Sequence, residues 1–133
     1  MLMNRQVHWA AHDSAALADA HTEDGVVQSP IFGTVCGRRE IEKTYLRLFE
    51  VFADWTFDTQ DIIIDGDRVV QLFHVKASHT SELFGLQATG RRFEINGALL
   101  LTFKDGRIAK ERRLYDFTSM LLQLGVLKAK PSA

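Results

Sequence analysis

The spacing of apolar residues along this chain changes from a helical period in the first third to alternation in the rest. Two short helices are predicted at residues 3–12 and 15–20, with a short strand after them at 26–29. The clearest helix is predicted over residues 38–52, where apolar residues recur every three or four positions. Its apolar stripe consists of Ile41, Tyr45, Leu48, Phe49 and Phe52.

After residue 54 the pattern becomes that of β-strands. Four long strands are predicted, at residues 55–64, 68–79, 92–103 and 107–116. Turn sequences at 65–67 and 104–106 join the first strand to the second and the third to the fourth as hairpins. Helices followed by an antiparallel meander predict an α+β fold. A curved sheet covered on one face by the amino-terminal helices would enclose an apolar pocket.

Strand alternation indicates which residues face that pocket. The odd-numbered residues of 92–103 form a clean apolar face, and the odd-numbered face of 68–79, which includes His79, is also favoured for the core. On 107–116 neither face is clean. Arg112 and Asp116 share one side with Ile108, and a single β-bulge would reverse the assignment. The inward face of this strand is therefore left open.

Apolar residues also remain on the nominally outer sides of the strands. Leu72 and Leu100 lie there, together with Leu114 or Tyr115. This is more apolar surface than a solvated face needs, and it predicts a homodimer formed through the outer face of the sheet.

Composition narrows the possibilities further. The 133 residues fit a single domain spanning 1–133, and the formal net charge of −1 gives no sign of a nucleic-acid or membrane-surface partner. The one cysteine, Cys36, cannot form an intrachain disulfide. No apolar run approaches the roughly 20 residues of a membrane span, and the start lacks the apolar region of a secretion signal. A cytoplasmic protein is expected.

Four segments carry a resemblance to a known family: residues 12–30, 65–70, 79–91 and 105–125. In these segments the chain resembles the SnoaL-like polyketide cyclase (ester cyclase) family, within the superfamily of nuclear transport factor two and ketosteroid isomerase. The resemblance implies a cone-shaped α+β barrel and cofactor-free acid–base chemistry of aldol type on a polyketide-like carbonyl compound. It also implies that Asp116 is the acid–base residue. The chain departs from the family at Ser81, where a glycine is usual.

Asp116 has two interpretations. A carboxylate in an apolar pocket has a raised pKa, which suits a group that takes a proton alpha to a carbonyl and later returns it. Alternatively Asp116 caps the last helix, predicted at 118–124, because aspartate is a preferred N-cap residue. Both hold if the carboxylate lies at the mouth of the pocket.

The other candidate residues also have two interpretations each. His79 could polarise a substrate oxygen, or bond loop backbone as a structural histidine. Arg112 could hold an acidic substrate group, or pair with a neighbouring strand. Three of the four arginines at 91, 92, 112 and 113, and the histidines at 8 and 12, are expected to be solvated. Five aromatic residues could line a pocket for a planar ligand or serve as core: Phe32, Tyr45, Phe49, Trp55 and Phe84.

No glycine-rich phosphate loop and no metal-ligand pattern is present, so neither a cofactor nor a metal is expected. Three functions remain open: a cyclase, an isomerase like ketosteroid isomerase, and a non-catalytic module that binds a small apolar ligand or dimerises. A catalytic site needs at least two polar groups that converge on the pocket. The number of such groups therefore distinguishes the enzymes from the module.

Overall fold

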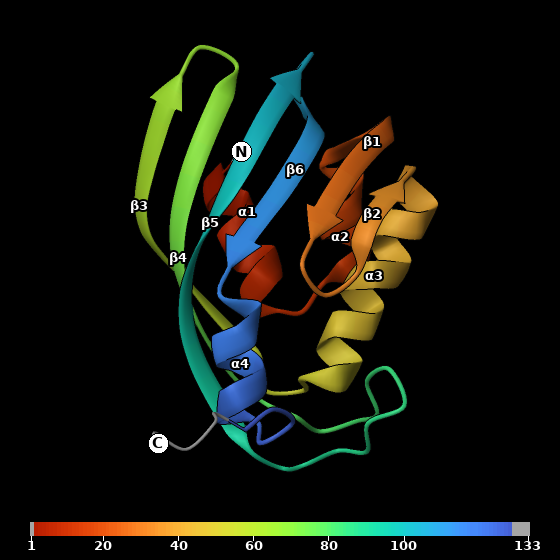
Figure 1. Cartoon of the computed structure of the whole chain (residues 1–133). Helices are drawn as coiled ribbons and strands as arrows, with labels where there is room; N and C mark the ends of the chain where they lie inside the picture. Colours follow the sequence, from red (N-terminus) through yellow and green to blue (C-terminus); the bar gives the residue numbers. More distant parts are fainter. Residues whose placement is uncertain (1, 129–133) are drawn as a thin grey trace.

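The computed structural model describes residues 2–128 and contains four helices and a six-stranded sheet (Figure 1). The helices are α1 (Leu2–Ala10), α2 (Ser14–Asp19), α3 (Arg38–Val51) and α4 (Phe117–Gln123). As expected, the apolar stripe of α3 is buried. Asp13 caps α2 by accepting the Ala16 N–H at 3.0 Å. None of the described helices is long and apolar enough to cross a membrane.

The sheet has the order β2-β1-β6-β5-β4-β3. Neighbouring strands are antiparallel except for β1 and β6, which run parallel. The strands are β1 (His21–Ser29), β2 (Gly33–Cys36), β3 (Thr56–Asp65), β4 (Arg68–Ser78), β5 (Arg92–Lys104) and β6 (Arg107–Tyr115). β2 is absent from the elements that the sequence pattern predicts. At four residues, β2 is too short to show an alternating pattern.

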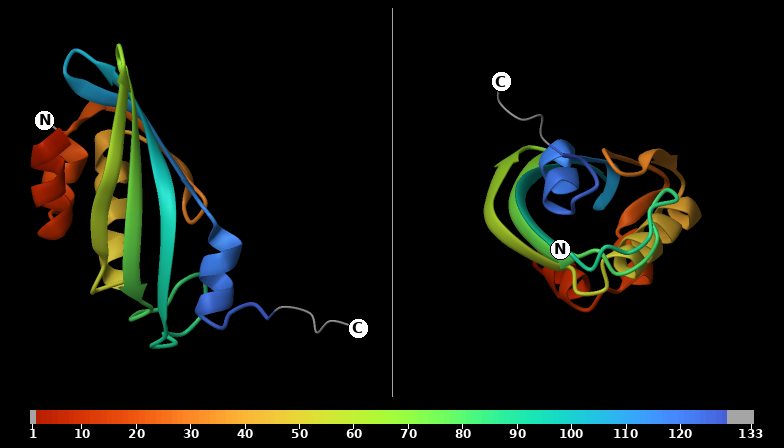
Figure 2. Two further views of the ribbon diagram at one scale, coloured as in Figure 1. Left: turned by 90° about the vertical axis from the view of Figure 1, so that its left-hand side faces the viewer. Right: turned by 60° about the horizontal axis from the view of Figure 1, so that its bottom comes forward.

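The sheet bends strongly, and α1, α2 and α3 lie on its concave side (Figure 2). Gly97 contributes to this packing. A Cβ at Gly97 would lie 2.6 Å from the Leu114 carbonyl oxygen and would overlap the ring of Phe73. The missing side chain therefore lets Phe73 cover the middle of β5. The result is the expected cone-shaped α+β fold.

The expected inward faces of β4 and β5 are confirmed. Residues 69, 71, 73, 75 and 77 of β4 are buried, as are 93, 95, 99 and 101 of β5. The open assignment of β6 is resolved by a bulge: Thr102 pairs with Lys110 whereas Phe103 pairs with Ile108, so Ala109 is an extra residue. Beyond Ala109 the odd-numbered residues of β6 face inward and the even-numbered ones face outward.

Candidate functional site

The interior of the cone holds a small cavity with a volume of about 20 Å³. It is lined by Trp9, Leu48, Trp55, Phe57, Phe73, Ile95, Leu99, Arg113 and Tyr115. Trp9 stacks on Phe57 with ring centroids 4.4 Å apart, so the walls are largely aromatic. A cavity of this volume has room for about one water molecule. Larger hollows, such as one over Val70 and Leu100, are open and lie on the outer surface.

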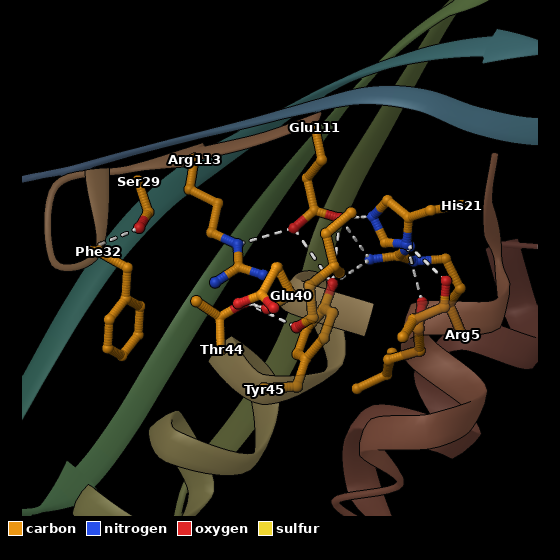
Figure 3. Close-up of polar contacts among 12 residues, drawn as sticks. Arg5, His21, Ser29, Phe32, Glu40, Thr44, Tyr45, Glu111 and Arg113 are labelled. Atoms are coloured by element: carbon orange, nitrogen blue, oxygen red, sulfur yellow. Dashed lines mark hydrogen bonds and ion pairs between the residues drawn. The ribbon is translucent and has the colours of Figure 1, made fainter. Parts of the chain in front are cut away.

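A cluster of buried charges adjoins this cavity and centres on Glu111 (Figure 3). The Glu111 carboxylate accepts hydrogen bonds from Arg5 Nη2 at 3.0 Å, His21 Nε2 at 3.1 Å and Arg113 Nε at 2.7 Å. The Tyr45 hydroxyl donates to the same carboxylate at 3.2 Å. Residues from α1, β1, α3 and β6 therefore meet at one carboxylate.

Glu111 is held in its ionised form by this cluster. Burial alone would raise the pKa of Glu111, but the charges of Arg113 and Arg5 and the hydrogen bond from His21 hold it well below its usual value. A carboxylate that is so strongly stabilised as an anion is a poor proton acceptor. We therefore assign Glu111 as the counter-ion of the cluster.

His21 is oriented by two sets of acceptors. Its Nδ1 lies 3.0 Å from the Leu17 carbonyl oxygen, at the end of α2, and its Nε2 faces the Glu111 carboxylate. The two guanidinium groups of Arg5 and Arg113 outnumber the single carboxylate of Glu111, so the cluster carries surplus positive charge.

Arg113 connects the cluster to the cavity. Its guanidinium carbon lies 4.8 Å from the centroid of the Tyr45 ring, and its Nε is bound to Glu111. The residue is only 7% exposed, and its buried Nη2 has no hydrogen-bond partner within residues 2–128. Arg113 therefore presents a free donor and a positive charge beside the aromatic cavity.

Arg112 on β6 and Asp116 just after it, the two polar residues predicted on 107–116, lie outside this cluster. Asp116 is exposed and caps α4, since its carboxylate accepts the Ser119 N–H at 2.9 Å. The expected shielding of this carboxylate from water is not found, because the bulge at Ala109 turns the even-numbered residues outward. Arg112 is exposed for the same reason, and Arg113 occupies the inward position instead. Whether Asp116 takes part in catalysis stays a prediction.

His79 is buried as the strand pattern indicates, but it does not line the cavity. Its Nδ1 accepts the Thr89 N–H at 3.3 Å, and its ring packs 6.2 Å from that of Phe52. This environment fits the structural interpretation of His79, in which the ring bonds loop backbone. A catalytic role for His79 also stays a prediction.

The five predicted aromatic residues separate into three groups. Trp55 lines the cavity, whereas Tyr45 and Phe49 lie next to it in the charge cluster and the core. Phe32 and Phe84 contact each other with ring centroids 6.5 Å apart, and Phe84 is 63% exposed. These two lie outside the cavity lining.

Sequence reasoning missed four residues of the interior site: Arg5, His21, Glu111 and Arg113. The sequence pattern assigns no role to His21, and this residue is fully buried. Charged residues are seldom buried without partners, so isolated positions in the sequence gave no reason to place them inside. One signal was present. If a bulge is assumed on 107–116, Glu111 and Arg113 fall on the inward side together.

Comparisons with known proteins identify the family. The sequence profile described as SnoaL-like polyketide cyclase matches residues 2–124, and the chain belongs to this family. Among curated proteins, no sequence matches this chain.

Several solved structures share the fold. AclR from Streptomyces galilaeus, described as a candidate hydroxylase, is 25% identical over 95% of this chain and 79% of its own, with a TM-score of 0.79. IdmH from Streptomyces antibioticus, described as a candidate polyketide cyclase, is 26% identical over 90% of this chain and 91% of its own, with a TM-score of 0.74. TerC, co-crystallised with polyporic acid, is 14% identical over 93% and 95%, with a TM-score of 0.77.

Proposed function

We propose that this member of the SnoaL-like polyketide cyclase family is a small-molecule enzyme that carries out cofactor-free acid–base chemistry of aldol type on a carbonyl compound. The observation that carries the proposal is the free Arg113 donor beside an aromatic cavity. Removal of a proton alpha to a carbonyl places negative charge on the carbonyl oxygen. A fixed cation in a water-poor site stabilises that charge as it develops.

A proton acceptor is also required, and Glu111 is unsuited to this role because its pKa is held low. We retain Asp116 as the proposed acceptor. It directly follows Tyr115, which lines the cavity, and it caps α4 at the end of β6. In this proposal Arg113 holds the carbonyl oxygen and Asp116 moves the proton from the edge of the site.

The size of the cavity limits how a ligand is bound. A volume of about 20 Å³ accepts the oxygen end of a carbonyl compound, so lining side chains have to move to admit its ring. TerC, a protein of the same fold, was co-crystallised with polyporic acid, which supports a small organic compound as the ligand of this chain. We propose a polyketide-like compound as the ligand of this chain.

Proton exchange tests the reaction before any product is known. Polyketide-like and steroid-like ketones are incubated with the protein in D₂O, and NMR follows deuterium entry at the alpha carbon. If Asp116 is the acceptor, Asp116→Asn slows exchange by about a hundred- to ten-thousandfold. Glu94→Gln, a neutralised carboxylate on the outer face of β5, serves as the matched control and leaves the rate unchanged. Unaltered exchange in Asp116→Asn would remove Asp116 from the mechanism.

The alternatives are separated by the same experiment. An isomerase like ketosteroid isomerase would also move a double bond in a steroid-like ketone, which NMR detects directly. A non-catalytic binding module is favoured by one observation: among the described residues that line the cavity, Arg113 is the only charged one, and no second charged group faces it there. Ligand binding without proton exchange above the buffer rate would establish the module.

We also propose that the chain forms a homodimer through the outer face of its sheet. Leu72, Ala98 and Leu114 are paired across β4, β5 and β6 and form one row on that face. Both leucines are exposed in the single chain. An apolar row across three strands is the kind of surface that a second copy covers.

A further inference from the structure

We infer that the interior site selects a negatively charged ligand, a planar compound with an ionised carboxyl or ring hydroxyl group, and that Arg113 is its anchor. This inference rests on the proposed function only for the location of the ligand. It concerns the charge of the bound species, and no reaction is needed to test it.

The first support is the kind of polar atom that lacks a partner. Among the residues that line the cavity, the buried side-chain nitrogens and oxygens without a hydrogen bond are Trp9 Nε1, Trp55 Nε1 and Arg113 Nη2. All three are donors. Buried donors without partners are destabilising, and a ligand that brings acceptor oxygens would satisfy them.

The second support is the charge of the surrounding cluster. The two positive charges of Arg5 and Arg113 exceed the single negative charge of the Glu111 carboxylate. Burial raises the pKa values of Tyr45 and Tyr115, so neither phenol supplies a compensating negative charge near neutral pH. A neutral ligand leaves this surplus uncompensated, a cation increases it, and an anion balances it.

The third support is the way in which Arg113 is held. Its Nε is fixed by Glu111 at 2.7 Å and its plane lies beside the Tyr45 ring, so the guanidinium is oriented before any ligand binds. A pre-oriented guanidinium is well suited to an oxyanion because its donors lie in one plane. Glu111 thus acts as a positioning residue for Arg113.

The aromatic side chains that line the cavity indicate the shape of the apolar part of the ligand. Trp9 and Phe57 lie stacked, and Phe57 in turn stacks on Phe73 at 4.8 Å between centroids. Flat side chains of this kind pack best against flat rings. The oxyanion at Arg113 and the aromatic walls together indicate an ionised group conjugated to a ring.

The test uses two pairs of probes that differ mainly in charge: formate with formamide, and benzoate with benzamide. Formate is close to water in size and samples the polar end alone, whereas benzoate also samples the walls. The chain contains two tryptophans, Trp9 and Trp55, and both line the cavity. Their indole N–H resonances in a ¹⁵N-labelled protein therefore report directly on occupancy, at constant ionic strength set with NaCl.

In the wild-type protein, formate and benzoate are expected to shift both indole resonances and to bind more tightly than their amides by about ten- to a hundredfold. Arg113→Met should remove this preference. Arg112→Met, which deletes the same charge one residue away on the outer face, should retain it. Trp55→Phe should weaken benzoate binding less than Arg113→Met, because it removes one donor and no charge.

Equal affinity for benzoate and benzamide in the wild-type protein would overturn the inference, and this measurement requires no variant to fold. Binding that leaves the indole resonances in place would also overturn it, because the ligand would then lie outside the cavity. Neither result bears on the proton-exchange experiment with Asp116, so failure of the charge assignment and failure of the proposed reaction remain distinguishable.

Discussion

Glu111 and Arg113, two residues apart on β6, point to the same side of the strand and form an ion pair inside the cone, with Arg113 Nε 2.7 Å from Glu111 Oε2. Because side chains alternate along a strand, one segment of chain supplies both partners. Arg5 and His21 reach the same carboxylate from other elements. The pair is therefore fixed by β6 and completed by residues of α1 and β1.

Neutralising Glu111 should destabilise the protein and change its response to acid. The folded state lowers the pKa of Glu111, so its contribution to stability is present above the unfolded-state value of about 4.3 and is lost as the pH falls below it. Glu111→Gln should lower the free energy of unfolding at pH 7 by about 3–5 kcal/mol, and by less near pH 3. Urea denaturation at both pH values measures the difference.

Glu94→Gln is the control for this prediction. Glu94 pairs with His74 on the outer face, where its side chain is 57% exposed. Its loss should change stability by less than about 1 kcal/mol. If Glu111→Gln were as mild as Glu94→Gln at pH 7, the buried cluster would not be the stabilising centre described above.

Removing the cap of α4 should have a modest effect. Asp116→Ala leaves the Ser119 N–H without its side-chain acceptor and should reduce stability by about 1 kcal/mol, whereas Asp116→Asn should be nearly neutral. Asp13→Ala at the start of α2 removes the same kind of contact and should have a similar effect. Thermal melts of the three variants give the comparison. A large loss in Asp116→Asn would indicate that the carboxylate does more than cap.

Adding a methyl group at Gly97 should be more disruptive than its size suggests. Gly97→Ala forces Phe73 to move and brings the new Cβ to 2.6 Å from the Leu114 carbonyl oxygen. We expect a loss of about 1–3 kcal/mol in urea denaturation. Asn96→Ala, at the neighbouring outward position, should change stability much less. Equal effects of the two substitutions would show that β5 can relax around Gly97.

The proposed dimer predicts a mass near twice 15.1 kDa in sedimentation equilibrium at micromolar concentration. Leu114→Lys on the outer face should return the mass to that of one chain, because a charge in the apolar row opposes association. Val7→Lys serves as control, since Val7 is exposed on α1 away from that face. A wild-type protein that sediments as a single chain would contradict the proposal.

Much of the fold could be predicted because its strongest signals are local. The stripe on α3 and the alternation on β4 and β5 follow from periodicity alone. The site was less predictable because it depends on one extra residue. Ala109 has no property that marks a bulge. The bulge at this residue nevertheless places Arg113 and Tyr115 on the inner face, where the unbulged alternation would have placed Arg112. β2 has only four residues, which is too few to show an alternating pattern of apolar and polar positions.

The cluster at Glu111 also has a consequence for how the chain reaches its folded state. Arg5 and Glu111 are separated by 106 positions, and β1 is completed on one side by β6. During synthesis the ribosome releases Arg5, His21 and Tyr45 long before their common carboxylate exists. Arg5 therefore lacks its counter-ion until β6 has emerged. Contacts with such large sequence separation slow folding, so the buried cluster that holds the interior together is also a contribution to a slow folding rate.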